Sequence, residues 1–133
     1  MEREHVVLPR KHLPRGMNRL PFSDAVRVGE TLYISGRIGL DPETGKPPAD
    51  VRDEARVLMD DVRHVVESAG ATMDDLVMVT IFAPDVGDFA AFTEVYLSYF
   101  GENLPARAFI GSGALLYGAR FELTAVAAVT KRG

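Results

Sequence analysis

The sequence of 133 residues contains no cysteine, and this absence excludes several kinds of chemistry. Disulfides, thiol nucleophiles and thiolate metal sites all depend on cysteine. Only three histidines are present, His5, His12 and His64, and no two of them have the spacing of metal ligands on a helix. We therefore expect a protein that works without a bound metal.

Long apolar runs and an excess of basic residues are missing too. No stretch approaches the ~18–20 apolar residues that span a bilayer, and the charged start Met1-Glu2-Arg3-Glu4 lacks the apolar core of a signal peptide. Fifteen basic and nineteen acidic side chains give a net charge of -4, whereas a nucleic acid backbone usually meets a basic face. These features favour a cytoplasmic protein with no membrane and no nucleic-acid partner.

The length and composition are typical of one soluble globular domain. Hydrophobic residues make up 47% of the chain and charged residues 26%. Residues 1–17 carry basic side chains, prolines and a glycine, which predict an N-terminal arm on the surface with at most a short edge strand at Val6-Val7. Residues 18–133 are expected to form the single domain.

Hydrophobic periodicity predicts two helices. From Val51 to Ala69, apolar residues recur at spacings of three and four, which is typical of a helix with one buried face. Asp50 can cap its N-terminus, and Gly70 can end it in a left-handed conformation. A second helix is expected from about Asp88 to Phe100, with its aromatic side chains in the core.

Five segments rich in apolar and β-branched residues predict strands. They are residues 25–28, 31–35, 76–83, 107–111 and 120–129. The first two are separated by Gly29-Glu30 and predict a hairpin, whereas the third is nearly all apolar and is expected to be buried on both faces. The order ββαβαββ indicates an α+β fold in which two helices cover one face of a mixed sheet. The other face then needs a cover, and self-association is the simplest one.

Arg107 and Glu122 are the residues most suited to chemistry. Pro105 marks the start of a strand, so the backbone at Arg107 is held, and its guanidinium can bind a carboxylate through two parallel hydrogen bonds. Glu122 lies between Phe121 and Leu123, where a carboxylate is costly unless it is paired or used. If their strands are antiparallel neighbours, both side chains can point away from the helices. The residues alone leave two interpretations open, a salt bridge or a substrate-binding site.

Several stretches between Leu20 and about Val129 form a further pattern. They are Pro21-Phe22-Ser23-Asp24-Ala25-Val26, Leu32-Tyr33-Ile34-Ser35-Gly36, Asp41-Pro42-Glu43-Thr44-Gly45, Asp88-Phe89 before Tyr96 and Phe100, and Pro105-Ala106-Arg107 followed by Phe121-Glu122-Leu123. In their order and spacing, these stretches resemble the reactive-intermediate deaminase family, also called Rid or YjgF and formerly endoribonuclease L-PSP. The resemblance implies a chorismate-mutase-like fold and a homotrimer with three clefts between subunits. It also implies hydrolysis of 2-enamine and 2-imino acids to 2-keto acids and ammonia.

The resemblance implies roles for individual residues as well. Arg107 corresponds to the arginine that binds the substrate carboxylate, and Glu122 to the glutamate that positions or activates the attacking water. Ser35, Gly36 and Phe109 correspond to positions that line the cleft. Because a 2-imino acid is already electrophilic at C2, orientation and proton removal suffice, and no cofactor is expected.

Two residues depart from the family's pattern and bear on the substrate. Phe22 replaces a tyrosine that is common in the deaminases, so a hydroxyl group at the cleft is absent. Arg37 replaces the usual glutamine and is expected to add a positive charge near the site, which would favour a second carboxylate on the substrate. These changes, with an altered run at residues 110–116, leave open the alternative of a module that binds small carboxylates without turnover. An RNA-cleaving role, sometimes attributed to the family, is disfavoured by the net charge and the scattered histidines.

Overall fold

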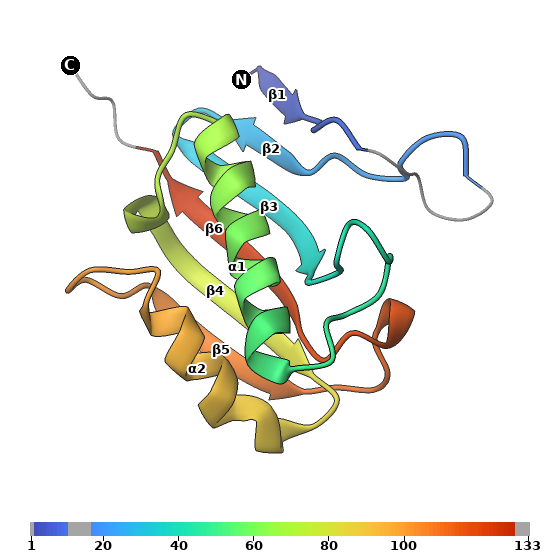
Figure 1. Ribbon diagram of the computed structural model, residues 1–133. Coiled ribbons are helices and arrows are strands. Elements are labelled where there is room, and N and C mark those ends of the chain that lie inside the picture. The colour runs from blue at the N-terminus through green and yellow to red at the C-terminus, as the bar shows by residue number, and fades with distance from the viewer. Residues whose placement is uncertain (1, 11–16, 130–133) are drawn as a thin grey trace.

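The amphipathic segment after Asp50 forms helix α1 (Val51–Ser68) in the computed structural model, which describes residues 2–10 and 17–129 (Figure 1). The Asp50 carboxylate accepts hydrogen bonds from the backbone N–H groups of Arg52 and Asp53 at 2.8 and 3.1 Å. It thereby caps two N–H groups that have no acceptor within the helix. Gly70 follows the helix with φ +81°, a conformation that favours glycine. The predicted helix and its two end signals are confirmed.

Six strands form one mixed sheet. They are β1 (Arg3–Val6), β2 (Ala25–Val28), β3 (Thr31–Ile38), β4 (Leu76–Ala83), β5 (Ala106–Gly111) and β6 (Glu122–Ala128). Their order is β1-β2-β3-β6-β4-β5, and all neighbours are antiparallel except β4 and β5. The α+β fold and the hairpin at Gly29 are confirmed. The edge strand expected near Val6 is β1, so the start of the chain is part of the sheet.

The strand order contradicts one prediction, because β5 and β6 are not neighbours. β4 lies between them, parallel to β5 and antiparallel to β6. The connection from β4 to β5 passes through helix α2 (Phe89–Leu97), and a parallel pair needs such a crossover. β6 takes a central place between β3 and β4, where its inward side chains Leu123, Ala125 and Ala127 are buried.

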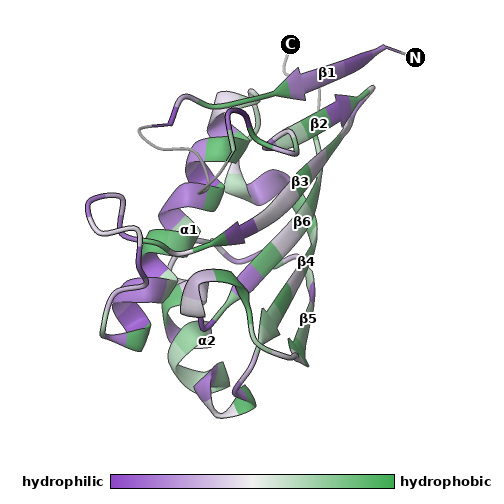
Figure 2. Ribbon diagram, turned by 90° about the vertical axis from the view of Figure 1, so that its right-hand side faces the viewer, coloured by the Kyte–Doolittle hydropathy of each residue, from purple (hydrophilic) through white to green (hydrophobic). Residues whose placement is uncertain are grey.

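Both helices lie on one face of the sheet, and the other face is uncovered in the single chain (Figure 2). α2 is shorter than expected and ends at Leu97, but Phe92 and Tyr96 belong to the core as predicted. On the uncovered face Tyr33 and Met78 are exposed, so within one chain β4 is buried on one face only. Neither helix, nor any other in residues 2–10 and 17–129, is long and apolar enough to cross a membrane.

Asp24 is fully buried where β1, β2 and β3 meet. Its carboxylate accepts hydrogen bonds from the Leu8 N–H at 2.8 Å, from Arg37 Nη1 at 2.5 Å and from both terminal nitrogens of Arg10. Its backbone oxygen accepts from the Ser35 N–H at 3.0 Å. Burial alone would raise the pKa of this carboxyl, but the hydrogen bonds from Arg10, Leu8 and Arg37 hold the pKa well below its usual value. Asp24 is therefore a buried anion that joins three strands.

Gly39, which follows β3, leaves no room for a side chain. A Cβ atom there would contact the backbone oxygen of Glu54 and lie 3.1 Å from the Leu58 nitrogen, both on α1. Because the backbone of a packed helix cannot shift cheaply, Gly39→Ala should lower the free energy of unfolding by about 1–3 kcal/mol. Gly101→Ala is the matched control, since a Cβ there meets nothing within 4 Å. Chemical denaturation measures both variants, and equal stabilities would contradict the close contact at Gly39.

Asp24→Asn is expected to lower the free energy of unfolding at neutral pH by about 3–5 kcal/mol, because it leaves buried guanidinium charge without its partner. The folded-state pKa of Asp24 lies below its unfolded value of about 4. The stabilisation is therefore complete above about pH 4 and is lost as the pH falls toward the folded-state pKa. Urea unfolding from pH 7 to about pH 3 should show that the difference in free energy of unfolding between variant and wild type decreases in acid. A difference that stays constant would contradict this prediction. Asp53→Asn, which changes an exposed carboxylate, serves as the control.

Candidate active site

The alternation of β6 places Glu122 on the uncovered face of the sheet, where it is half-buried. Its cross-strand neighbours are Ile38 of β3 and Phe82 of β4, so the carboxylate lies between two apolar residues. Within residues 2–10 and 17–129, Glu122 has no hydrogen bond or ion pair through its side chain. The carboxylate at the first residue of β6 thus has no partner in this part of the chain.

A β-bulge brings Gly36 beside this carboxylate. Ile34 pairs with Ala125 and Arg37 pairs with Leu123, so β3 has one residue more than β6 over this stretch. A Cβ atom at position 36 would lie 2.5 Å from Glu122 Oε2. Because glycine has no Cβ, the Glu122 carboxylate can lie directly against the backbone of β3.

Ser35 and Phe22 lie next to this bulge. The Ser35 hydroxyl donates a hydrogen bond to the Ser23 backbone oxygen at 2.6 Å, which holds the segment with Phe22 against the end of β3. The Phe22 ring is exposed, and no hydroxyl group is present at this position. The structure thus brings Gly36 and Glu122 together, with Ser35 next to Gly36 in the chain and Phe22 on the segment that Ser35 binds.

Arg107 and Phe109 lie against α2 instead. Arg107 Nη2 donates to Thr93 Oγ1 at 3.2 Å, and the central guanidinium carbon is 5.2 Å from the ring centre of Phe89 and 4.8 Å from that of Tyr96. Arg107 Nη1 is buried and has no hydrogen-bond partner in the described part of the chain. The Phe109 ring packs edge-on against Phe89, with 5.1 Å between the ring centres. The guanidinium therefore makes cation–π contacts with two rings, while its Nη1 has no hydrogen-bond partner in the described part of the chain.

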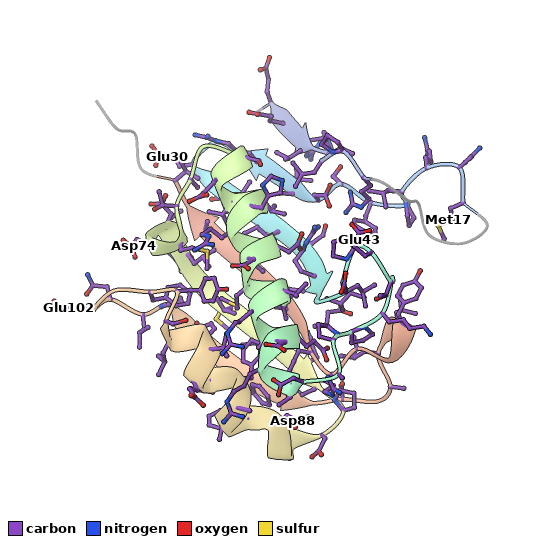
Figure 3. All side chains as sticks on the ribbon, in the orientation of Figure 1. Met17, Glu30, Glu43, Asp74, Asp88 and Glu102 are labelled. Carbon is purple, nitrogen blue, oxygen red and sulfur yellow. The ribbon has the colours of Figure 1, made fainter. Side chains whose placement is uncertain are left out.

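Arg107 forms no ion pair within residues 2–10 and 17–129. Of the acidic residues labelled in Figure 3, Asp88 ends the 3-10 turn Val86–Asp88 before α2 and Glu102 lies in the loop before β5; neither pairs with Arg107. Glu122 is separated from it by β4 and lies on the other face of the sheet. The condition under which Arg107 and Glu122 could both point away from the helices, antiparallel pairing of their strands, is not met, and the alternation of β5 turns the Arg107 side chain toward α2. The two residues form no salt bridge with each other in one chain.

Arg37 is buried on the helix side of β3 and not beside Glu122. Its guanidinium donates to the Asp61 carboxylate of α1 at 2.6 and 3.1 Å and to Asp24 at 2.5 Å. The expectation of a free positive charge near the site needs correction, because the bulge reverses the alternation of β3 and turns Arg37 inward. Two carboxylates of the same chain already use this guanidinium, so it offers no clamp for a second substrate carboxylate.

Three residues of α2 surround Arg107 and are not recognisable as site residues from the sequence. Phe89, Thr93 and Tyr96 follow at spacings of four and three and so share one face of the helix. The spacing of the two aromatic residues is equally typical of core positions. Burial raises the pKa of the Tyr96 hydroxyl, against the lowering effect of Arg107, so this hydroxyl is neutral near pH 7. Their proximity to Arg107 depends on the β4–α2–β5 crossover.

The candidate residues form two half-sites on opposite faces of the sheet. The carboxylate half-site consists of Phe22, Ser35, Gly36 and Glu122, and the arginine half-site consists of Phe89, Thr93, Tyr96, Arg107 and Phe109. The first offers a carboxylate without a partner in the described residues, and the second offers a cation with an unused donor, Arg107 Nη1. Residues 2–10 and 17–129 contain no cluster of histidine, aspartate and glutamate that could hold a metal ion.

Known proteins match almost the entire chain. The model of the family Endoribonuclease L-PSP matches residues 16–129. The 2-iminobutanoate/2-iminopropanoate deaminase of Mus musculus is 39% identical over 80% of this chain and 80% of its own. A RutC family protein of Pyrococcus abyssi is 36% identical over 80% of this chain and 85% of its own. The putative reactive intermediate deaminase TdcF of Escherichia coli is 34% identical over 80% of this chain and 85% of its own.

Solved structures share the fold. The crystal structure of E. coli TdcF with bound serine has a TM-score of 0.82 and 30% identity, and the match covers 96% of this chain and 100% of that one. The crystal structure of the E. coli YjgF gene product has a TM-score of 0.81 and 31% identity, with 94% and 98% covered. From the family model, these relatives and the shared fold, the chain belongs to the endoribonuclease L-PSP family, also known as the Rid or YjgF family.

Proposed function

We propose that the protein is a cofactor-independent hydrolase that converts reactive 2-imino and 2-enamino acids into 2-keto acids and ammonia. The observation that carries the proposal is the pair of unused charges, a Glu122 carboxylate without a partner and an Arg107 guanidinium with a buried free donor. A substrate with a carboxylate next to an electrophilic carbon fits this pair. The names of relatives as 2-iminobutanoate/2-iminopropanoate deaminases support the proposal, as does the serine bound to TdcF, because serine carries the same carboxylate.

The mechanism needs only positioning and proton transfer. Arg107 binds the substrate carboxylate through its planar donor group. A water molecule beside the Glu122 carboxylate donates a proton to it while the water oxygen attacks C2 of the imine. Glu122 passes this proton to the nitrogen, which gives a carbinolamine. Glu122 then takes the proton of the new hydroxyl group and delivers it to the nitrogen as the C–N bond breaks, so that ammonia and the 2-keto acid leave. An enamino acid enters the same path after protonation at C3 converts it into the imine.

The two half-sites can meet on one substrate only if they come from two copies of the chain. β4 separates β5 from β6, and two strand spacings measure about 10 Å. Arg107 also faces α2, whereas Glu122 faces the uncovered side. The carboxylate and C2 of a 2-imino acid are directly bonded, so the substrate cannot span the sheet. A homotrimer whose uncovered, partly apolar faces are buried would provide such shared clefts.

Replacement of the two charged residues should abolish most of the activity for different reasons. Arg107→Ala is expected to lower kcat/KM by about 10²-fold through lost positioning, and Glu122→Gln to lower kcat by about 10²–10⁴-fold through loss of the base. Arg107→Lys should also fail, because lysine lacks the planar donor group. Ketoacid and ammonia release from 2-aminoacrylate, made in situ by a serine or threonine dehydratase, measures these rates.

Arg63→Gln is the control for the loss of an arginine, since Arg63 forms an exposed ion pair with Asp60 on α1. A wild-type protein without turnover, or an Arg107→Ala variant as active as the control, would contradict the proposed function. Calorimetry with 2-ketobutyrate then decides whether the alternative holds. Binding without turnover would indicate a carboxylate-binding module.

Mixing two inactive variants tests whether the site is shared between copies. In trimers assembled at random from equal amounts of Arg107→Ala and Glu122→Gln chains, about one quarter of the clefts would combine an intact arginine with an intact glutamate. Refolded mixtures should therefore regain about a quarter of wild-type activity. Light scattering and capture through a tag on one variant verify that mixed trimers form. Mixed trimers without activity would contradict the shared site.

A further inference from the structure

We propose that the buried pair of Asp24 and Arg37 is a positioning device for the candidate active site: it holds the β-bulge that keeps Gly36 against the Glu122 carboxylate. The inference rests on the proposed function for its effect on turnover, but its structural part can be tested independently. Neither residue touches the space beside Glu122, so both would act through the backbone of residues 35–36.

The direction of the side chains along β3 shows the effect of the bulge. Leu32 and Ile34 face the core, so a regular strand would turn residue 36 inward and residue 37 outward. The opposite is observed, because Gly36 is exposed and Arg37 is only 7% exposed. The extra residue between the pairs Ile34–Ala125 and Arg37–Leu123 causes this reversal. A regular register would therefore remove the glycine from its place beside Glu122.

Arg37 has strong reasons to stay on the inner side. Its guanidinium binds Asp24 with one terminal nitrogen and Asp61 of α1 with two further nitrogens, at distances from 2.5 to 3.1 Å. Moving Arg37 outward would break these charge-assisted hydrogen bonds and leave the fully buried Asp24 with fewer donors. The ion pairs therefore favour the bulged register over the regular one.

Asp24 accepts hydrogen bonds from the residues before and after Gly36. Its backbone oxygen accepts the Ser35 N–H at 3.0 Å, before the glycine, and its carboxylate accepts Arg37 Nη1 at 2.5 Å, after it. Arg10 and the Leu8 N–H bind the same carboxylate from the N-terminal segment. One residue thus fixes the backbone at both ends of the bulge, and the glycine at its centre leaves room for the Glu122 carboxylate.

Arg37→Gln tests the proposal in the full-length protein. We expect kcat to fall by about tenfold or more, because small misplacements of catalytic groups cost rate steeply. KM for the imine should change by less than about threefold, since Arg107 belongs to the other half-site and is untouched. Asp61→Asn, which removes one anchor of Arg37 and leaves Asp24 in place, should change kcat in the same direction by a smaller factor. If Arg37→Gln does not fold, Asp61→Asn carries the test.

Val66→Ala is the matched control, because it weakens the core beneath α1 and removes none of the ion pairs of Asp24 or Arg37. Even if this control lowers Tm as much as Arg37→Gln does or more, its kcat should stay within about twofold of the wild-type value. The folded fraction of each variant is measured by circular dichroism, and kcat is corrected for it. An Arg37→Gln variant that also keeps kcat within about twofold would overturn the proposal.

A crystal structure of Arg37→Gln separates this inference from the proposed function. A shifted or regular pairing of β3 with β6 at residues 34–37 supports it even if the wild type shows no turnover. An unchanged bulge with Gly36 still beside Glu122 overturns it, whatever the activity of the wild type. Failure of the deaminase assay alone therefore rejects the proposed function and leaves the crystal structure to decide on the bulge.

Discussion

The buried carboxylate of Asp24 is the interaction on which the first half of the sheet depends. A charge without access to water is tolerated only when several donors satisfy it. Here the donors come from the N-terminal segment, through Leu8 and Arg10, and from β3, through Arg37. Arg37 in turn binds Asp61, so the same network reaches α1. Strand pairing, helix packing and the direction of the side chains around Gly36 are therefore coupled.

The order of the strands and their alternation determine where Arg107 and Glu122 lie in the sheet. The crossover through α2 makes β5 an edge strand parallel to β4, and β6 closes the sheet between β3 and β4. Alternation along β5 then turns Arg107 toward α2, and alternation along β6 turns Glu122 to the uncovered face. A single chain consequently carries a cation and a base that cannot reach one small substrate. Under the proposed function, assembly and catalysis depend on each other, because the uncovered face and the incomplete site need the same partner.

Local patterns explain how much of the fold could be predicted from the sequence. The apolar repeat of α1, its cap at Asp50 and its end at Gly70 depend on neighbours within a few residues. The hairpin at Gly29 is local in the same sense. The placement of β6 between β3 and β4 is not, because many orders of apolar strands bury similar surface and no short motif selects among them. Assuming that β5 and β6 pair, as strands that follow each other often do, gave Arg107 the wrong face.

The sequence by itself indicated which residues are candidates for chemistry, since an arginine just after Pro105 can bind a carboxylate and a glutamate between Phe121 and Leu123 is costly unless it is paired or used. Family resemblance added the glycine and serine of β3. Tertiary structure alone decided where these groups point. Arg37 is the clearest case, because a bulge of one residue exchanges the two faces of a strand, and the carboxylates that hold Arg37 inward are 13 and 24 residues away. Such distant charges leave no local signal, whereas a reactive residue type is visible at its own position.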